Sequence, residues 1–347
     1  MARFTENRWT SAIIPALLIH IPIGTVYCWS VFKQLIADRL HASPASVEWG
    51  FSLAIFFLGM SAAFAGPMVE KNIKKSALVS MVCFVVGFAG TGVSIALNFL
   101  PGVFICYGAI MGIGLGVGYL TPVKNLMLWF ADNKGLATGI AVAGFGLALI
   151  SQEKDILHDV LRAFPQYANL SPAKFAAAIS GIIGLVLAVD SVFNTAGRVG
   201  FSTLSDHLKR RETVYQVIFI MSIAVCLLQI FTNSIGNALL WAVLAMLFLV
   251  NAGYGGGFST LPVLLDQHFG TKTVSTTHGL TLSAWAFAGL SGNQLASSVV
   301  AHAPDQAHRY AALIPVITGL FVVALISISL VKYLGDRNVT KAVEDRG

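Results

Sequence analysis

Long apolar runs separated by short polar segments make up most of this sequence. A helix that crosses about 30 Å of hydrocarbon needs about 20 mainly apolar residues, and backbone polar groups in lipid must be satisfied within their own segment. The pattern therefore predicts an all-α membrane protein, a helical bundle of about ten transmembrane helices. The predicted spans cover approximately residues 9–32, 49–68, 77–97, 102–123, 135–150, 176–203, 215–233, 238–261, 277–300 and 311–333.

The composition excludes a water-soluble fold. Hydrophobic residues make up 56% of the chain and charged residues only 11%, whereas soluble domains carry about 25% charged residues. The net charge of +6 comes mostly from basic residues in the short loops, so it bears on membrane topology and no nucleic-acid partner is expected. The four cysteines lie within apolar runs without a CxxC pair, and we interpret them as small buried hydrophobes.

The loops between the spans differ in their content of lysine and arginine. Fourteen basic residues lie in one alternating set of loops and six in the other, namely Arg3, Arg8, Lys71, Lys74, Lys75, Lys134, Lys209, Arg210, Arg211, Lys272, Lys332, Arg337, Lys341 and Arg346 against Lys33, Arg39, Lys154, Arg162, Lys174 and Arg309. The richer set is expected in the cytoplasm. This predicts a multi-pass protein of the inner (plasma) membrane with both termini cytoplasmic, and a first span that is not cleaved as a signal peptide.

The longest polar interruption covers residues 151–172 and is predicted to lie outside the cell. Its acidic and histidine side chains, Glu153, Asp155, His158 and Asp159, suggest a metal cluster at first sight. Nothing supplies a closed set of ligands, however, and a solvated loop face explains them better. We therefore expect neither a metal nor another cofactor. No nucleophile–base pair occurs in the spans, so an enzyme is not expected either.

Two loops share one pattern, in which a small residue ends a helix, an acid follows four positions later and a basic cluster comes next. Its members are Gly66, Glu70 and Lys71 in the first loop and Ser202, Asp206 and Arg210 in the second. The acid can cap or ion-pair with a neighbouring helix end. The repeated loop resembles the signature of the major facilitator superfamily, which recurs once in each half of those proteins.

Further motifs resemble the oxalate/formate antiporter family within that superfamily, over most of the chain. They are GTVYCWSVF from Gly24, GIGLGVGYLTP from Gly112, WFADNKGLATG from Trp129, NTAGR from Asn194, NAGYGGGF from Asn251, and His278-Gly279 followed by Ala284-Trp285. The resemblance implies a secondary carrier of small carboxylates that works by alternating access. The glycine pairs four residues apart in span 4 indicate close helix packing rather than a phosphate cradle.

The chain departs from the twelve spans of that superfamily. Span 5 starts in the family manner at Lys134-Gly135 but passes at Ser151 into polar sequence that resembles the external loop between family spans 7 and 8. The apolar stretch from Gly135 to Ile150 covers only about 24 Å. We interpret this as an internal deletion of family spans 6 and 7, with a true ten-span carrier as the alternative. The resulting divisions are residues 1–150, an external loop 151–175, residues 176–335 and a cytoplasmic tail 336–347.

Arg198 is the main candidate for binding a substrate. It lies eight residues before Asp206, roughly 12 Å inside the membrane by helix rise, where a charge is costly unless it faces a polar cavity or partner. A guanidinium can bind a carboxylate through two hydrogen bonds; the alternative is that Arg198 extends to the cytoplasmic surface. Asn194 and Asp190 share its helical face, and Asn251 belongs to a later motif. Asp190 is a possible charge partner or proton carrier.

Aromatic residues with polar tips are the other candidates. Tyr27, Tyr119, Tyr254 and Trp285 fall in spans that correspond to family helices 1, 4, 10 and 11, and packing is the competing interpretation of each. Lys124 near the end of span 4 is a possible second cation, although a lysine in such a position usually extends its ammonium group to the membrane surface. Oxalate carriers of the family place a lysine where this chain has Trp285, so the resemblance implies a monocarboxylate such as formate, lactate or pyruvate, with oxalate less favoured.

Two hypotheses follow from the sequence. The first is a carrier of small carboxylates in the lipid bilayer, working either by antiport or by symport with protons. The second is a transport-inactive remnant or membrane sensor of the same family, because transport sites form between the two halves of such carriers and a deletion damages one half. The sequence leaves the substrate, the coupling mode and the oligomeric state open.

Overall fold

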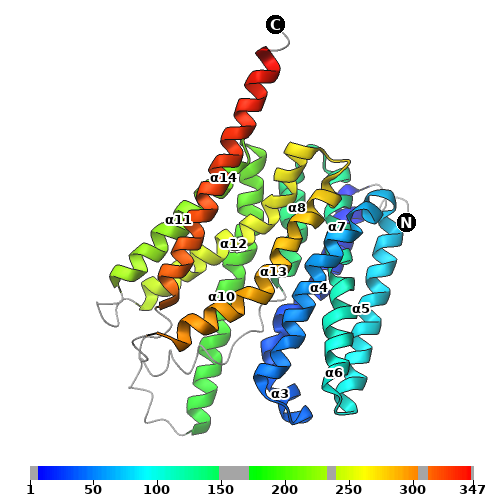
Figure 1. Ribbon diagram of the computed structural model, residues 1–347, viewed down its shortest axis with the longest axis vertical. Helices are drawn as coiled ribbons and strands as arrows, with labels where there is room; N and C mark the ends of the chain where they lie inside the picture. Colours follow the sequence, from blue (N-terminus) through cyan, green and yellow to red (C-terminus); the bar gives the residue numbers. More distant parts are fainter. Residues whose placement is uncertain (1–6, 148–171, 233–239, 304–311, 345–347) are drawn as a thin grey trace.

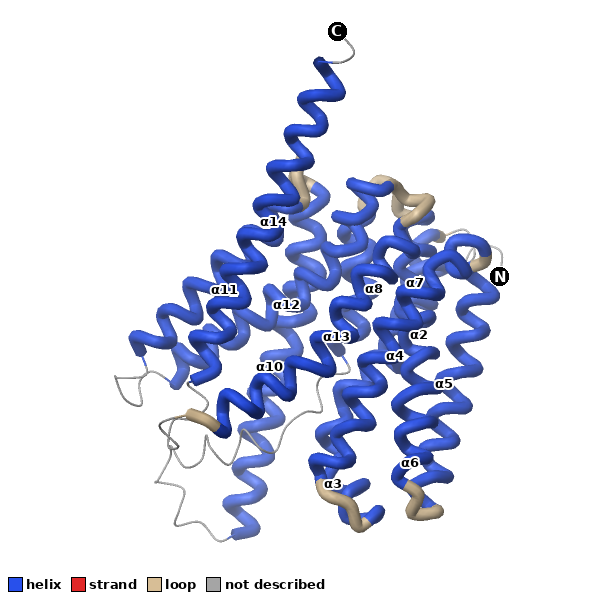
Figure 2. Tube along the Cα trace, viewed as in Figure 1, coloured by secondary structure: helices blue, strands red, loops and turns tan. Residues whose placement is uncertain are grey.

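The computed structural model describes residues 7–147, 172–232, 240–303 and 312–344. These residues form helices and short connections without any strand (Figure 2). Residues 151–171 of the predicted polar loop, with their acidic and histidine side chains, lie outside the described residues. The helices are η1 (Trp9–Ile13), α2 (Ile14–Gly24), η2 (Thr25–Cys28), α3 (Trp29–Leu40), α4 (Pro44–Lys71), α5 (Ile73–Ala96), α6 (Leu100–Val103), η3 (Phe104–Met111), α7 (Gly112–Trp129), α8 (Lys134–Leu147), α10 (Pro172–Asp206), α11 (Glu212–Thr232), α12 (Leu240–Phe269), α13 (Val274–Ala301) and α14 (Leu313–Glu344).

Several helices continue beyond the apolar runs that predicted them. The first helical segment extends through α3 to Leu40, and α14 continues to Glu344 without a break at residue 335. Local capping explains two of the starts. Ser43 accepts a hydrogen bond from the backbone N–H of Ser46 at the beginning of α4, and Asn72 accepts one from Lys75 at the beginning of α5. Such caps satisfy backbone donors that have no partner within the helix.

The helices pack as two groups joined along two long contacts (Figure 1). In the first group, α7 packs against α4 and α5, and α2 packs against α8. In the second, α12 packs against α10 and α11, and α11 packs against α14. Between the groups, α4 lies along α13 and α8 lies along α10. Segments far apart in the sequence therefore meet along the middle of the bundle.

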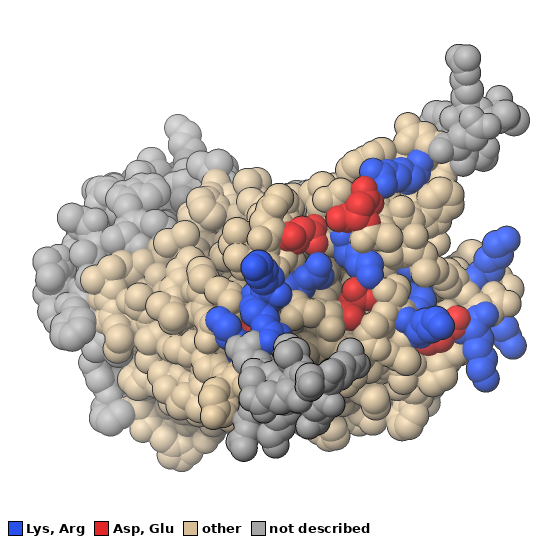
Figure 3. All heavy atoms as spheres, turned by 90° about the horizontal axis from the view of Figure 1, so that it is seen from above, with Lys and Arg blue, Asp and Glu red and all other residues tan. Residues whose placement is uncertain are grey.

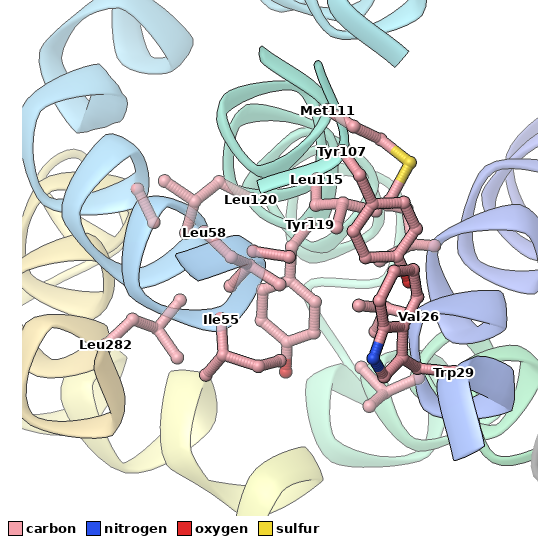
Figure 4. Close-up of a cluster of buried hydrophobic side chains, with 14 of the residues drawn as sticks. Val26, Trp29, Ile55, Leu58, Tyr107, Met111, Leu115, Tyr119, Leu120 and Leu282 are labelled. Atoms are coloured by element: carbon pink, nitrogen blue, oxygen red, sulfur yellow. The ribbon is translucent and has the colours of Figure 1, made fainter. Parts of the chain in front are cut away.

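The largest buried cluster lies where the first group meets α13. Figure 4 shows Tyr119 and Leu115 of α7 beside Leu58 and Ile55 of α4, with Leu282 of α13 at the edge of the same cluster. All five side chains are buried. The cluster therefore ties the two groups together.

Glycines in α7 permit the close approach of its neighbours. A Cβ atom at Gly112 or Gly116 would run into the backbone of α4, and one at Gly114 or Gly118 would run into Ser80 of α5. The two pairs thus face two different helices, as expected for small residues spaced by four in membrane helices.

The outer surface suits a lipid environment. In α5 and α14, large apolar side chains such as Phe88 and Val323 are more than half exposed. Among the described residues, five helical stretches are long and apolar enough to cross a membrane, namely Pro44–Lys71, Ile73–Ala96, Leu100–Trp129, Glu212–Gln229 and Leu313–Gly335. The predicted all-α membrane bundle is confirmed, whereas the number of ten spans stays a prediction.

Candidate substrate site

Arg198 lies in the interior of the second helix group. Its side chain is only 1% exposed, and its Nε donates a hydrogen bond of 2.7 Å to the Oδ1 of Asn194, one turn earlier in α10. Backbone of α12 passes close by, because a Cβ at Gly255 would meet the Arg198 side chain. The guanidinium is thus held in the protein interior. It does not extend to the surface, in contrast to the alternative interpretation of Arg198.

Polar side chains continue from Arg198 across to α12. The amide of Asn194, which is fully buried, donates to the Oδ1 of Asn251 at 2.8 Å. The amide of Asn251 donates in turn to the carboxylate of Asp190. Asp190, Asn194 and Arg198 follow one another at intervals of four residues, so they share one face of α10. The structure therefore joins all four residues in one chain of hydrogen bonds that begins at a carboxylate and ends at a guanidinium.

Two histidines and a tyrosine form a second polar cluster between the helix groups. The ring of Tyr119 makes edge contacts with His20 of α2 at 5.5 Å and with His278 of α13 at 5.6 Å between centroids. All three side chains are completely buried. The three side chains come from α2, α7 and α13, so the cluster lies where the two helix groups meet.

His20 and His278 were missed as site candidates in the sequence. The available signal was the occurrence of a histidine inside each of two apolar runs, because a titratable group at membrane depth is a functional candidate by default. Their convergence on Tyr119 depends on how α2, α7 and α13 pack, which spacing along one chain does not reveal.

The other aromatic candidates lie in different surroundings. Tyr254 is 42% exposed and lines an apolar groove of about 310 Å³ between α11, α12 and α14. Its ring packs on Phe258, which packs in turn on Trp285 of α13, with centroids 4.9 and 4.8 Å apart. These contacts form an aromatic row between α12 and α13. Tyr27 falls in η2, and its side chain lies outside the described residues.

Glu70 joins the two helix groups at one end of the bundle. One carboxylate oxygen accepts hydrogen bonds from the backbone N–H groups of Ser275 at 2.7 Å and Thr276 at 3.3 Å, in the first turn of α13. The other oxygen pairs with the ammonium of Lys124, which also donates to the carbonyl of Thr271. Lys124 therefore belongs to this end network, and we assign it no substrate contact.

Asp206 makes the corresponding contact on the other side of the interface. Its two carboxylate oxygens accept hydrogen bonds from the backbone N–H groups of Gly135 and Leu136, both 2.9 Å long, in the first turn of α8. Arg211 lies 3.6 Å from the same carboxylate. Burial lowers the pKa of the Arg211 guanidinium, while the charges of Asp206 and Asp266 act in the opposite direction.

Charged side chains of both signs gather at this end, as seen in Figure 3. Lys134 forms an ion pair of 2.7 Å with Asp266 and also donates to Thr271. His268 lies 2.8 Å from the carboxylate of Glu212. Of the remaining loop positions in the repeated pattern, Lys71 is exposed, Arg210 is half-buried, and Gly66 and Ser202 face the helices of the opposite group.

Comparison with known proteins connects this architecture to membrane transporters. Residues 17–151 match the family described as the Major Facilitator Superfamily. An uncharacterized MFS-type transporter of Escherichia coli (strain K12), YhjX, is 22% identical over 80% of this chain and 85% of its own length. The oxalate:formate antiporter of Oxalobacter formigenes is 22% identical over 92% of this chain and 90% of its own length.

Other similarities are either shorter or structural. Apicoplast pyruvate carrier 1 of Toxoplasma gondii is 26% identical over 41% of this chain and 33% of its own length. The solved structure of the Escherichia coli fucose:proton symporter superposes with a TM-score of 0.58 at 14% identity, covering 92% of this chain and 99% of that one. A bacterial homologue of ferroportin in its outward-facing state gives 0.56 at 12% identity, with the same coverage. The chain therefore has the fold of a major facilitator transporter.

Proposed function

Starting from the major-facilitator fold, we propose that this protein is a secondary active transporter of small organic anions and works by alternating access. The observation that carries the proposal is Arg198, a cation that is 1% exposed and held by Asn194 inside the bundle. A charge at membrane depth is costly unless it serves a partner or a substrate. A planar guanidinium suits a carboxylate, which it can bind through two parallel hydrogen bonds.

A monocarboxylate such as lactate, pyruvate or formate is the proposed substrate. The names of two relatives, an oxalate:formate antiporter and a pyruvate carrier, both refer to small carboxylates. In this chain, Lys124 is engaged by Glu70 and position 285 is a tryptophan packed on Phe258. Arg198 is thus the one cation that we assign to the site, and a single cation favours one carboxylate over two, so oxalate is the less favoured substrate.

We also propose that the chain is a twelve-span carrier from which spans 6 and 7 have been deleted, with halves at residues 1–150 and 176–335. In the undeleted carrier of twelve spans, a span of the first half and its equivalent in the second half are six spans apart. By that offset, α4 corresponds to α10, α5 to α11, α7 to α12 and α8 to α13. Each of three helix contacts then has its symmetric counterpart: α4–α7 matches α10–α12, α5–α7 matches α11–α12, and α4–α13 matches α8–α10.

A ten-span repeat explains the same contacts less well. It would relate α4–α7 to α11–α13, and these two helices are not among the closely packed pairs in the described part of the chain. The two acids also support the deletion, because Glu70 and Asp206 lie in the last turns of α4 and α10, the helices that an offset of six makes equivalent. Moreover, the alignment with the oxalate:formate antiporter extends over 388 positions, more than the 347 residues of this chain.

The two acid caps are the proposed gate on the cytoplasmic side. Glu70 binds the start of α13 and Asp206 the start of α8, so each cap links one half of the bundle to the other. Alternating access requires the halves to rock against each other around a central site, and opening this end breaks both caps. We further propose that this end, with both termini, faces the cytoplasm, as the basic loops favour.

Uptake into proteoliposomes tests the transport proposal. Purified protein is reconstituted, and the entry of labelled lactate, pyruvate, formate and oxalate is followed with and without the same carboxylate inside. We expect uptake or exchange of at least one monocarboxylate, abolished by Arg198→Ala and retained by Arg39→Ala, which removes an exposed arginine. If the protein binds a carboxylate but moves none, the alternative of a membrane sensor or inactive remnant replaces the carrier.

Accessibility to a membrane-impermeant thiol reagent tests the orientation. In a variant without its native cysteines, a cysteine introduced at Ala42 and one introduced at Lys209 are expected to react from the outside and from the cytoplasm, respectively. Reaction of both from one side would contradict the proposed topology.

A further inference from the structure

We propose that His20 is the proton-binding residue that couples proton movement to carboxylate transport, and this inference rests on the proposed function. The site would then hold a proton on an imidazole of the first half and a carboxylate on Arg198 of the second half. The transported pair is one carboxylate anion and one proton. The coupling mode is thereby assigned to symport with protons.

The hydrogen bonding of His20 identifies the nitrogen that takes up the proton. Its Nδ1 lies 3.1 Å from the carbonyl oxygen of Ala16. A carbonyl only accepts hydrogen bonds, so Nδ1 must carry the hydrogen and the neutral ring presents a bare Nε2. That nitrogen is completely buried and makes no hydrogen bond among the described residues. The structure therefore contains a proton acceptor in the interior whose lone pair is not used by the fold.

The surroundings of His20 link this acceptor to the substrate site. The ring of Tyr119, itself a candidate for substrate binding, lies against the ring of His20 with the centroids 5.5 Å apart. The other titratable residues on the helices packed against α2 are Tyr27 and Cys28 of η2, Lys124 of α7 and Lys134 of α8, and His278 of α13 lies against the ring of Tyr119. Lys124 and Lys134 are held in ion pairs at the end of the bundle.

Electrostatics makes the two binding events favour each other. A protonated imidazole and the guanidinium of Arg198 are like charges within one buried region, and like charges in such a medium repel strongly. A carboxylate bound to Arg198 removes that repulsion. Binding one anion together with one proton also leaves the net charge of the site unchanged, so the loaded and the empty carrier move the same charge through the bilayer.

His278 and Asp190 are the competing acceptors. His278 is equally buried, but neither of its ring nitrogens makes a hydrogen bond among the described residues, so nothing fixes which of them carries the hydrogen. Asp190 accepts a hydrogen bond from the amide of Asn251 and is separated from Arg198 by two side chains, Asn251 and Asn194, along the polar chain. Among the described residues, His20 combines a hydrogen-bonded Nδ1, which fixes its tautomer, with a buried Nε2 that has no hydrogen-bond partner.

Transport driven by a pH gradient separates these possibilities. Proteoliposomes with an internal pH dye are given labelled lactate, or whichever monocarboxylate the wild type exchanges, at an acidic external pH. For one proton per carboxylate, a gradient of about one pH unit supports about tenfold accumulation. We expect the wild type to accumulate substrate and acidify the lumen. We expect His20→Gln to lose at least about ninety per cent of that accumulation while its exchange of internal for external substrate stays within about threefold.

Retained exchange shows that the variant is folded and still binds substrate, because exchange needs no net proton movement. His302→Gln removes an exposed histidine and is the matched control. The inference is overturned if the wild type exchanges carboxylate without proton uptake, if His20→Gln accumulates substrate like the wild type, or if only His278→Gln or Asp190→Asn loses coupling. Failure of the wild type to transport any carboxylate would instead overturn the proposed function itself.

Discussion

Glu70 accepts a hydrogen bond of 2.7 Å from the backbone N–H of Ser275, 205 residues away in the chain. The carboxylate thus caps α13, on the other side of the contact between the two helix groups, where backbone N–H groups and the helix dipole favour a negative charge. Asp206 does the same for α8. The contact explains why an acid recurs in the two loops, and it makes the loops part of the interface between the halves.

Removing the Glu70 carboxylate should destabilise the protein strongly. In Glu70→Ala, the ammonium of Lys124, with a side chain only 6% exposed, loses its charged partner and keeps only the carbonyl of Thr271. Breaking a buried ion pair in this way costs about 3–5 kcal/mol, and we expect a correspondingly lower melting temperature in detergent. Glu48→Ala breaks the ion pair of Glu48 with Lys33, which is more exposed than the pair of Glu70 with Lys124, and should have a small effect. Equal losses in the two variants would contradict a structural role for the cap.

Removing the Asp206 carboxylate should have a milder effect. Asp206→Ala leaves the first N–H groups of α8 without their acceptor, and loss of such a cap costs about 0.5–2 kcal/mol. Thermal unfolding measures the change. Asp132→Ala is the control, because that carboxylate is exposed and its hydrogen bonds go to its own loop and to Arg8. A melting temperature as high as that of the wild type would show that α8 does not depend on this contact.

The sequence predicted the helices and a capping or ion-pairing role for the two acids from local features, but it did not predict which helix each acid caps. Apolar runs predict helices in lipid without knowledge of their neighbours, and the position of Glu70 at a helix end already indicated a capping role. The contact partners of Lys124 and His20 could not be predicted in this way. The partner of Lys124 comes from α4, and the contact of His20 with Tyr119 depends on α2 packing beside α7. Such pairings are set by tertiary packing, which the spacing along one chain does not encode.

Enlarging a glycine of α7 should disturb the packing of the first half. A Cβ at Gly116 would meet the carbonyl oxygen of Leu58 in α4, and overpacking of this kind costs about 1–3 kcal/mol. We expect Gly116→Ala to lower the melting temperature in detergent. Gly92→Ala is the matched control, because nothing lies within 4 Å of a Cβ there. If the two substitutions behave alike, α4 and α7 do not approach as closely as described.

Shortening Asn194 should weaken substrate binding without removing it. The side chain accepts the Nε hydrogen of Arg198 and donates to Asn251, so Asn194→Ala leaves the guanidinium less firmly oriented. We expect the affinity for the transported carboxylate to fall about tenfold, equivalent to about 1.4 kcal/mol, as measured by the substrate concentration that half-saturates uptake. An unchanged affinity would place the substrate away from this chain of hydrogen bonds.

Equilibrium binding of a labelled monocarboxylate to the purified protein tests the central role of Arg198 most directly, because it needs no transport. The wild type is predicted to bind lactate or pyruvate saturably, and Arg198→Gln, which keeps a polar side chain but removes the charge, is predicted to lose that binding. Saturable binding of equal affinity in Arg198→Gln would contradict the account.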